Sequence, residues 1–170
     1  PLFIHETINT PTAIQSMPGC YQLPLSALTD ELNTLEALGI HAVLLFGIPA
    51  AKDLTGSCSL EADGIIQQAI RQIKKTHPHM LVIADACFCE YTSHGHCGTL
   101  DGEMIDNDAT LKTLGAQAVS FADAGADWIA PSGMTDGMVG AIREALDNAA
   151  HQDVAILSYA IKYSSCFYGP

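Results

Sequence analysis

The stretch MLVIADACFCEYTSHGHCG, residues 80–98, decides the fold, because it leads from a β-strand directly into a cysteine-rich loop. Residues 80–86 are an apolar run that carries a single charged side chain, Asp85. Short apolar runs bounded by turn-forming residues are typical of strands in a buried sheet. We therefore predict a strand over Met80–Ala86 whose carboxyl end meets the cysteines.

Apolar runs rich in Val and Ile recur on both sides of this strand, and they alternate with segments of helical periodicity. Such alternation is typical of parallel strands that are joined by crossover helices. The other predicted strands are Leu2–Ile4, His41–Gly47, Ala126–Pro131 and Val154–Ala160.

Four helices are predicted between the strands. The first runs from about Ser26 to Leu38, where Gly39 can supply a left-handed stop. The third is capped by Asn107 or Asp108 and ends at Gly125, and the fourth starts at Asp136. The apolar side chains expected to face the sheet are Leu28, Leu32, Leu35 and Leu38 in the first helix, Ile65, Ile66, Ala69, Ile70 and Ile73 in the second, Leu111, Leu114, Ala118, Val119 and Ala122 in the third, and Val139, Ile142, Ala145 and Leu146 in the fourth.

This order of elements favours an α/β fold of the TIM (β/α)8 barrel class. A complete barrel takes roughly 250 residues, so the 170 residues hold about five of its eight β/α units in one partial domain, residues 1–170. The first βα turn lacks a dinucleotide-binding fingerprint, which argues against a Rossmann sheet. Because the chain begins at Pro1 and ends at Gly169-Pro170, we expect that both ends are cut.

The charge balance excludes several classes of partner. Seven Lys and Arg stand against 19 Asp and Glu, so the formal net charge is −12. Nucleic acids and anionic membrane surfaces would repel such a surface. The longest apolar runs, Ala42–Phe46 and Val154–Leu157, are too short to cross a bilayer. We expect a cytoplasmic protein that binds neither nucleic acid nor membrane.

Three cysteines form a C-x-C-x7-C motif at Cys87, Cys89 and Cys97. Thiolates are preferred ligands of zinc, and three protein ligands with an open fourth position are typical of a catalytic zinc site. Neighbouring glycines would let the loop fold back on itself. His94 and His96 are alternative ligands, and a redox pair is a weaker alternative because C-x-C lacks the C-x-x-C spacing. The separate cysteines Cys20, Cys58 and Cys166 are interpreted as ordinary thiols.

Lys162 follows the last predicted strand, where its side chain would face the mouth of a barrel. Desolvation lowers the pKa of a lysine and frees its amine to form a Schiff base with a ketone. On periodicity alone, a surface lysine that opens the next loop explains the position better. Asp85 could orient a substrate amine or a ligand water, or it could be a structural carboxylate. Ser132 could be a turn residue and Asp136 a helix cap.

Several motifs together resemble porphobilinogen synthase, the 5-aminolaevulinate dehydratase family. They are LFGIP at 45–49, the cysteine motif at 85–98, NDATL at 107–111, APSGMTDG at 130–137 and SYAIKYSSCFYGP at 158–170. The resemblance implies a hydro-lyase of haem biosynthesis that condenses two 5-aminolaevulinate molecules to porphobilinogen with loss of water. It also implies a homo-octamer.

The resemblance also assigns roles to individual residues. Zn²⁺ would be held by Cys87, Cys89 and Cys97, and Lys162 would form the Schiff base. The substrate pocket would contain Asp85, Ser132 and Tyr168. Mg²⁺ would be bound through residues outside this chain, as would the second lysine and the substrate-carboxylate binders. The amino-terminal arm of the family would precede Pro1.

The chain departs from the family pattern in the loop after Ser132, which reads Gly-Met-Thr instead of Asp-Met-Met, and at Met138, where Arg is frequent. Two alternative functions are an inactive zinc-binding fragment and another Schiff-base class I aldolase, which would leave the thiols unused. For the 170 residues alone we expect no porphobilinogen formation and poor stability, because a half barrel exposes two strand edges and an unfilled interior.

Overall fold

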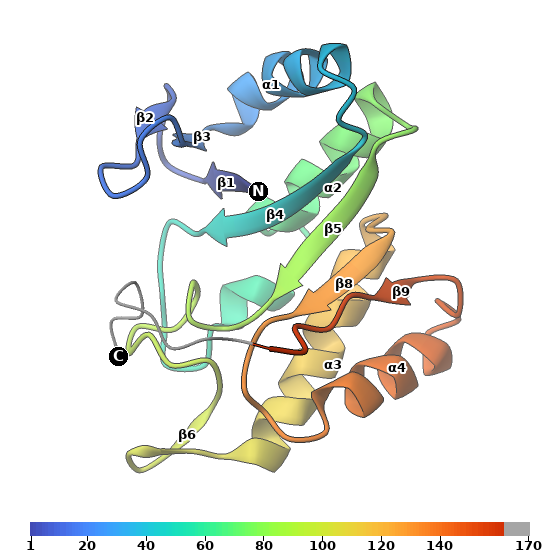
Figure 1. Ribbon diagram of the computed structural model, residues 1–170. Helices are drawn as coiled ribbons and strands as arrows, with labels where there is room; N and C mark the ends of the chain where they lie inside the picture. The colour runs from blue at the N-terminus through green and yellow to red at the C-terminus, as the bar shows by residue number, and fades with distance from the viewer. Residues whose placement is uncertain (162–170) are drawn as a thin grey trace.

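A computed structural model describes residues 1–161, which form a parallel sheet with helices on its outer side (Figure 1). The five predicted strands correspond to β1 (Leu2–His5), β4 (Ala42–Ile48), β5 (Leu81–Ala86), β8 (Trp128–Pro131) and β9 (Ala155–Ile156). They pair in parallel in the order β1-β4-β5-β8-β9, which is also their order in the sequence. Sequential parallel pairing is the arrangement of a β/α barrel, so the predicted fold class is confirmed as a partial barrel.

Two small pairs of strands were not predicted. β2 (Thr12–Ala13) and β3 (Tyr21–Leu23) precede the first helix, and β6 (Leu100–Asp101) pairs with β7 (Met104–Ile105) in the cysteine loop. Strands of two or three residues are too short to produce a recognisable hydrophobic period. β3 pairs with β1, so the sheet edge that was expected to be open at the first strand is covered.

The four predicted helices are present as α1 (Leu25–Ala37), α2 (Ile65–Thr76), α3 (Asn107–Asp123) and α4 (Met138–Asn148). A short 3-10 helix, η1 (Ser57–Leu60), precedes α2. Gly39 and Gly125 follow the ends of α1 and α3 with positive φ angles of 76° and 105°, as predicted. No helix among residues 1–161 has the length and hydropathy needed to cross a membrane.

The predicted helix starts need correction at two places. Asp106, rather than Asn107 or Asp108, caps α3, because its Oδ1 accepts a hydrogen bond of 3.0 Å from the Ala109 amide. α4 begins at Met138 and not at Asp136, because Gly137 has a left-handed φ of 81° that separates Asp136 from the helix.

Two apolar side chains that were expected in the core are exposed. Leu38 is 71% exposed because it lies at the C-cap of α1, beyond the last helical residue. Val139 is 41% exposed in the first turn of α4, where Ile142 and Leu146 alone form the buried stripe. The inward faces of α1 and α4 are therefore shorter than the sequence pattern predicts.

The two faces of the sheet differ in what covers them. Leu45 and Ile129 lie on the face packed against the helices and are fully buried. The alternate residues Phe3, Phe46 and Trp128 lie on the opposite face and are only half-buried. The rings of Phe3 and Phe46 stack there with centroids 5.3 Å apart. This second face, which we call the concave face, corresponds to the interior of the barrel.

The last predicted strand is shorter than expected. β9 covers Ala155–Ile156 rather than residues 154–160. Backbone hydrogen bonds from Leu157 to Ile129 (2.8 Å) and from Tyr159 to Pro131 (3.3 Å) still hold the chain beside β8. The chain therefore follows β8 beyond β9 without regular strand pairing.

Candidate functional site

The three cysteines of the motif converge in the loop that leaves β5. Their Sγ atoms all lie within 4.8 Å of one another, and the Cys87 and Cys89 sulfurs are 3.4 Å apart. Two thiolates bound to one tetrahedral zinc at 2.3 Å lie about 3.8 Å apart, so these separations suit a single ion. Among residues 1–161 this is the one group of His, Cys, Asp and Glu side chains close enough to hold a metal.

His94 and His96 do not join this group. His94 Nε2 lies 3.1 Å from the Leu54 carbonyl oxygen, and His94 Nδ1 accepts a hydrogen bond of 3.1 Å from the His96 amide. Both nitrogens of His94 therefore bind backbone. The two rings contact each other with centroids 5.4 Å apart. The donor set that remains is the three thiols.

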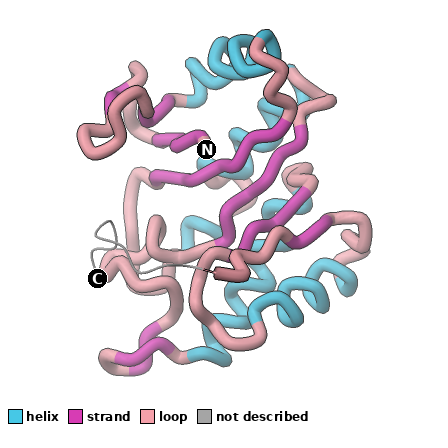
Figure 2. Tube along the Cα trace, viewed as in Figure 1, coloured by secondary structure: helices cyan, strands magenta, loops and turns pink. Residues whose placement is uncertain are grey.

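The glycine-assisted fold of the loop agrees with the prediction. The Phe88 carbonyl accepts hydrogen bonds from the amides of Tyr91 and Thr92, which forms a tight turn that contains Cys89. Gly95 adopts a positive φ of 78°. The Thr92 hydroxyl then donates a hydrogen bond of 2.8 Å to the His96 carbonyl, which fixes the residue before Cys97. Figure 2 shows that most of the segment between β5 and α3 is loop.

The protonation of the cluster depends on its crowding. The hydrogen bond between Cys87 and Cys89 raises the pKa of the Cys89 thiol. Hydrogen bonding with Cys97 and burial raise this pKa further. The hydrogen bond with Cys89 lowers the pKa of Cys87, but hydrogen bonding with Cys97 and burial outweigh this effect and raise the pKa of Cys87 overall. Burial, followed by the charge of Cys87, raises the pKa of the Glu90 carboxyl to about 7. Negative charge is thus unfavourable here unless a cation compensates for it.

Asp85 and Ser132 meet at the carboxyl ends of β5 and β8. The Ser132 hydroxyl donates a hydrogen bond of 3.0 Å to Asp85 Oδ2, and both residues are buried. Strand alternation places Asp85 on the concave face, two residues before Cys87 in the chain. The structure therefore brings together two of the three residues predicted to bind substrate.

Other predicted residues lie apart from the cluster or outside the description. Asp136 is exposed, and its amide donates a hydrogen bond of 2.9 Å to Asn107 Oδ1, which links the loop before α4 to the start of α3. Cys20 and Cys58 are free and partly exposed, in agreement with their interpretation as ordinary thiols. Lys162, Cys166 and Tyr168 lie outside the described residues.

Two residues near the cluster, Tyr159 and Gln117, were not predicted from the sequence to have a role in the site. Burial and the charge of Asp85 raise the pKa of Tyr159, which places its hydroxyl in the same electrostatic environment as the site. Gln117 of α3 is fully buried and donates a hydrogen bond of 3.1 Å to the Cys87 carbonyl. Strand alternation after β9 could have indicated Tyr159. No pattern in the sequence indicated Gln117.

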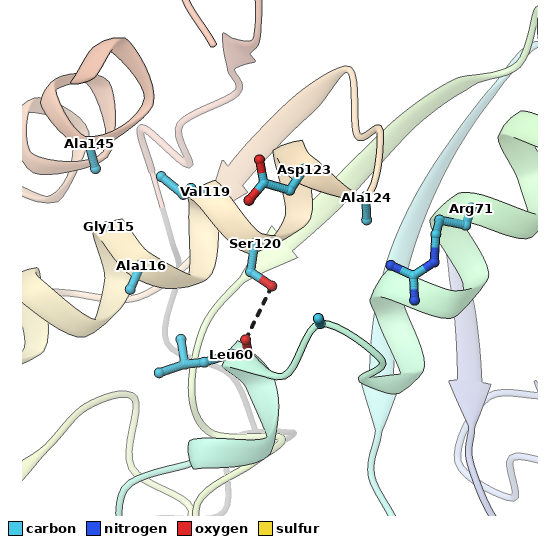
Figure 3. A pocket seen from close by; sticks show the side chains of 10 residues that line it. Leu60, Arg71, Gly115, Ala116, Val119, Ser120, Asp123, Ala124 and Ala145 are labelled. Carbon is cyan, nitrogen blue, oxygen red and sulfur yellow. Dashed lines mark hydrogen bonds between the residues drawn. The ribbon is translucent and has the colours of Figure 1, made fainter. Parts of the chain in front are cut away.

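A groove of about 580 Å³ lies on the helical side of the molecule, between η1, α2, α3 and α4 (Figure 3). Within the groove, the Ser120 hydroxyl donates a hydrogen bond of 3.3 Å to the Leu60 carbonyl. Small side chains such as Ala116 and Ala145 line it, and none of the predicted site residues does. The groove is therefore separate from the thiol cluster.

The fold and the site together define a β/α-barrel protein with a thiol-rich, metal-type centre at the carboxyl ends of its strands, the end at which barrel enzymes carry their active sites. The sequence model of the delta-aminolevulinic acid dehydratase family matches residues 1–170. The chain belongs to this family.

Individual relatives agree with this assignment. The chain is 51% identical over 170 residues to the delta-aminolevulinic acid dehydratase of Halalkalibacterium halodurans and 49% identical to that of Escherichia coli, and it spans 52% of the length of each. It also resembles the crystal structure of the Toxoplasma gondii enzyme in complex with the reaction product porphobilinogen, with a TM-score of 0.94 and 40% identity. That match covers 99% of this chain and 49% of the other. The chain thus spans about half the length of these relatives.

Proposed function

We propose that this chain is part of a porphobilinogen synthase, a lyase that condenses two 5-aminolaevulinate molecules to porphobilinogen with loss of water. The observation that carries the proposal is the convergence of three thiols, all within 4.8 Å of one another. The first of them, Cys87, lies two residues after Asp85, which accepts a hydrogen bond from the buried Ser132. Family membership and the porphobilinogen held by the T. gondii structure supply the substrate class.

The proposed cofactor is Zn²⁺, with Cys87, Cys89 and Cys97 as its ligands. The all-sulfur donor set favours zinc over magnesium, which prefers oxygen ligands. When bound, the ion would supply Lewis-acid polarisation of a substrate oxygen or activation of a water molecule. Its positive charge would also stabilise the ionised forms of the thiols and of Glu90, whose pKa values are raised in the absence of a cation. Any Mg²⁺ would be held by residues outside this chain.

Asp85 and Ser132 are proposed to bind substrate. Their hydrogen bond of 3.0 Å fixes the carboxylate on the concave face, where it can accept hydrogen bonds from a substrate ammonium group. The Ser132 hydroxyl orients this carboxylate and can exchange its bond for one to substrate. Burial of both side chains keeps bulk water from competing for these contacts.

Lys162 and Tyr168 complete the proposal, although both lie outside the described residues. The neutral amine of Lys162 would attack the ketone of one 5-aminolaevulinate and form a carbon–nitrogen double bond with release of one water molecule. Tyr168 would line the same pocket. The competing aldolase hypothesis uses the lysine but leaves the thiol cluster without a role, so the structure favours it less.

Reductive trapping tests the Schiff base. We expect borohydride, added with 5-aminolaevulinate to the complete protein, to attach a substrate-derived mass to Lys162, as located by peptide mass spectrometry. Lys162→Ala should lose this label, while Lys112→Ala, a change at an exposed lysine of α3, should keep it. Unchanged labelling in Lys162→Ala would defeat the assignment.

Chelation tests the metal. Removal of divalent ions should abolish porphobilinogen formation, measured by its colour reaction with an aromatic aldehyde, and Zn²⁺ should restore it more effectively than Mg²⁺. Full activity of thoroughly chelated protein would argue against a catalytic zinc. The homo-octameric state and the cytoplasmic location remain predictions, which gel filtration with light scattering and cell fractionation can check.

A further inference from the structure

Helix α3 holds the backbone on both sides of the cysteine cluster. On the entry side, Gln117 Nε2 donates a hydrogen bond of 3.1 Å to the Cys87 carbonyl. On the exit side, the Thr110 hydroxyl accepts a hydrogen bond of 3.0 Å from the Thr99 amide. Gln117 is 0% and Thr110 1% exposed, so water does not compete for either bond.

The two contacts come from one rigid element. Thr110 and Gln117 are seven residues apart, which is about two helical turns, so they share one face of α3 at a separation of roughly 10 Å along its axis. The exit contact is closely packed as well, because a Cβ at Gly98 would lie 2.4 Å from the Thr110 hydroxyl. The helix therefore fixes both ends of the loop that carries the three thiols.

The hydrogen bonding of Gln117 is not optimised for stability. Its Oε1 is buried and has no hydrogen-bond partner among residues 1–161. Buried polar atoms without partners are rare and unfavourable, and an apolar side chain of the same size would avoid this one. The bond that Gln117 gives to the Cys87 carbonyl accounts for a polar side chain at this core position.

We propose that Gln117 and Thr110 are positioning residues for the metal centre, which set the place of the cysteine loop through its backbone and so bring the thiols into binding geometry. This inference rests on the proposed function, because it presumes that the thiols bind a metal. Groups that orient metal ligands in this way typically change metal affinity 10–100-fold when they are removed.

Cobalt titration of the complete, reduced and metal-free protein tests the inference. Co²⁺ bound to thiolates gives sulfur-to-metal charge-transfer absorption, which reports affinity and coordination without any measurement of activity. We expect Gln117→Leu to weaken Co²⁺ binding about 10-fold or more. Thr110→Val should weaken it as well, and Thr110→Ser, which keeps the hydroxyl, should restore it.

Gln67→Leu is the matched control. Gln67 is also a buried glutamine, but its Nε2 donates to the Ser59 carbonyl and the Ser120 hydroxyl, away from the cysteine loop. We expect Gln67→Leu to lower the thermal midpoint and leave Co²⁺ affinity within about twofold of wild type. Normal Co²⁺ affinity in both Gln117→Leu and Thr110→Val would overturn the positioning role but not the metal site.

Further outcomes separate the two proposals. An equal loss of affinity in Gln67→Leu would mean that the effect is general destabilisation, and this would also overturn the positioning role. If Gln117→Leu does not fold, the Thr110→Val and Thr110→Ser pair decides. Wild-type protein without charge-transfer absorption at saturating Co²⁺ would refute the metal site itself, and the positioning role with it.

Discussion

Metal binding to the three thiols should release protons, because the cluster holds them tightly in the absence of a cation. The pKa values of Cys87 and Cys89 are both raised, so both thiols remain protonated at pH 7. A metal ion binds the thiolate form, so each of these protons must leave when the ion binds. We therefore expect at least two protons to be released for each Zn²⁺ bound between pH 6 and 7.5.

The magnitude follows from this proton count. Affinity for the metal rises tenfold per pH unit for each proton released, so two protons give an increase of about 100-fold per unit. The sign is fixed by the direction of the pKa shifts, since raised pKa values make binding stronger at higher pH. Glu90, whose pKa is about 7, adds to the effect if the bound cation also favours its ionised form.

Isothermal titration calorimetry in two buffers with different ionisation enthalpies measures the proton count directly. Cys89→Ser should reduce it by about one, because serine keeps its proton at these pH values. Cys20→Ser, at a thiol outside the cluster, should leave it unchanged. A count below one, or an unchanged count in Cys89→Ser, would refute the reasoning.

Two further predictions concern the surroundings of the site. Gly47→Ala should destabilise the protein by about 1–3 kcal/mol in urea unfolding, because its Cβ would lie 2.5 Å from the Tyr91 hydroxyl, whereas Gly140→Ala, with no atom within 4 Å, should not destabilise it. Asp53 accepts hydrogen bonds from Ser57 that hold its pKa well below the ordinary 3.8. This stabilisation is present above pH 3.8 and is lost as pH falls through the lowered pKa, so Asp53→Asn should increase proteolysis of the 50–60 loop at pH 7 more than at pH 3. A pH-independent difference would contradict this.

The sequence predicted the sheet better than the loops. The strands at Ala42–Ile48 and Leu81–Ala86 follow from apolar runs, because burial against helices demands apolar side chains along the whole strand. β3 could not be predicted, because three residues carry no period. The cap of α3 was misplaced by one residue, since Asp106, Asn107 and Asp108 are all good capping residues and only the backbone geometry distinguishes them.

The site was predictable where its residues are close in sequence. The C-x-C-x7-C spacing and the glycines placed Cys87, Cys89 and Cys97 together, and their convergence is confirmed. Gln117 could not be found in this way, because its partner is a backbone carbonyl 30 residues away. A lone polar residue within a helix gives no sign of what it contacts.

The concave face has a practical consequence for spectroscopy. Trp128 is the only tryptophan of the chain, and it lies on this face beside Ile83 and Ala155. Indole emission shifts to shorter wavelength when water is displaced from the ring. The intrinsic fluorescence of the protein therefore reports whether anything, a polypeptide segment or a small molecule, has come to cover the concave face of the sheet.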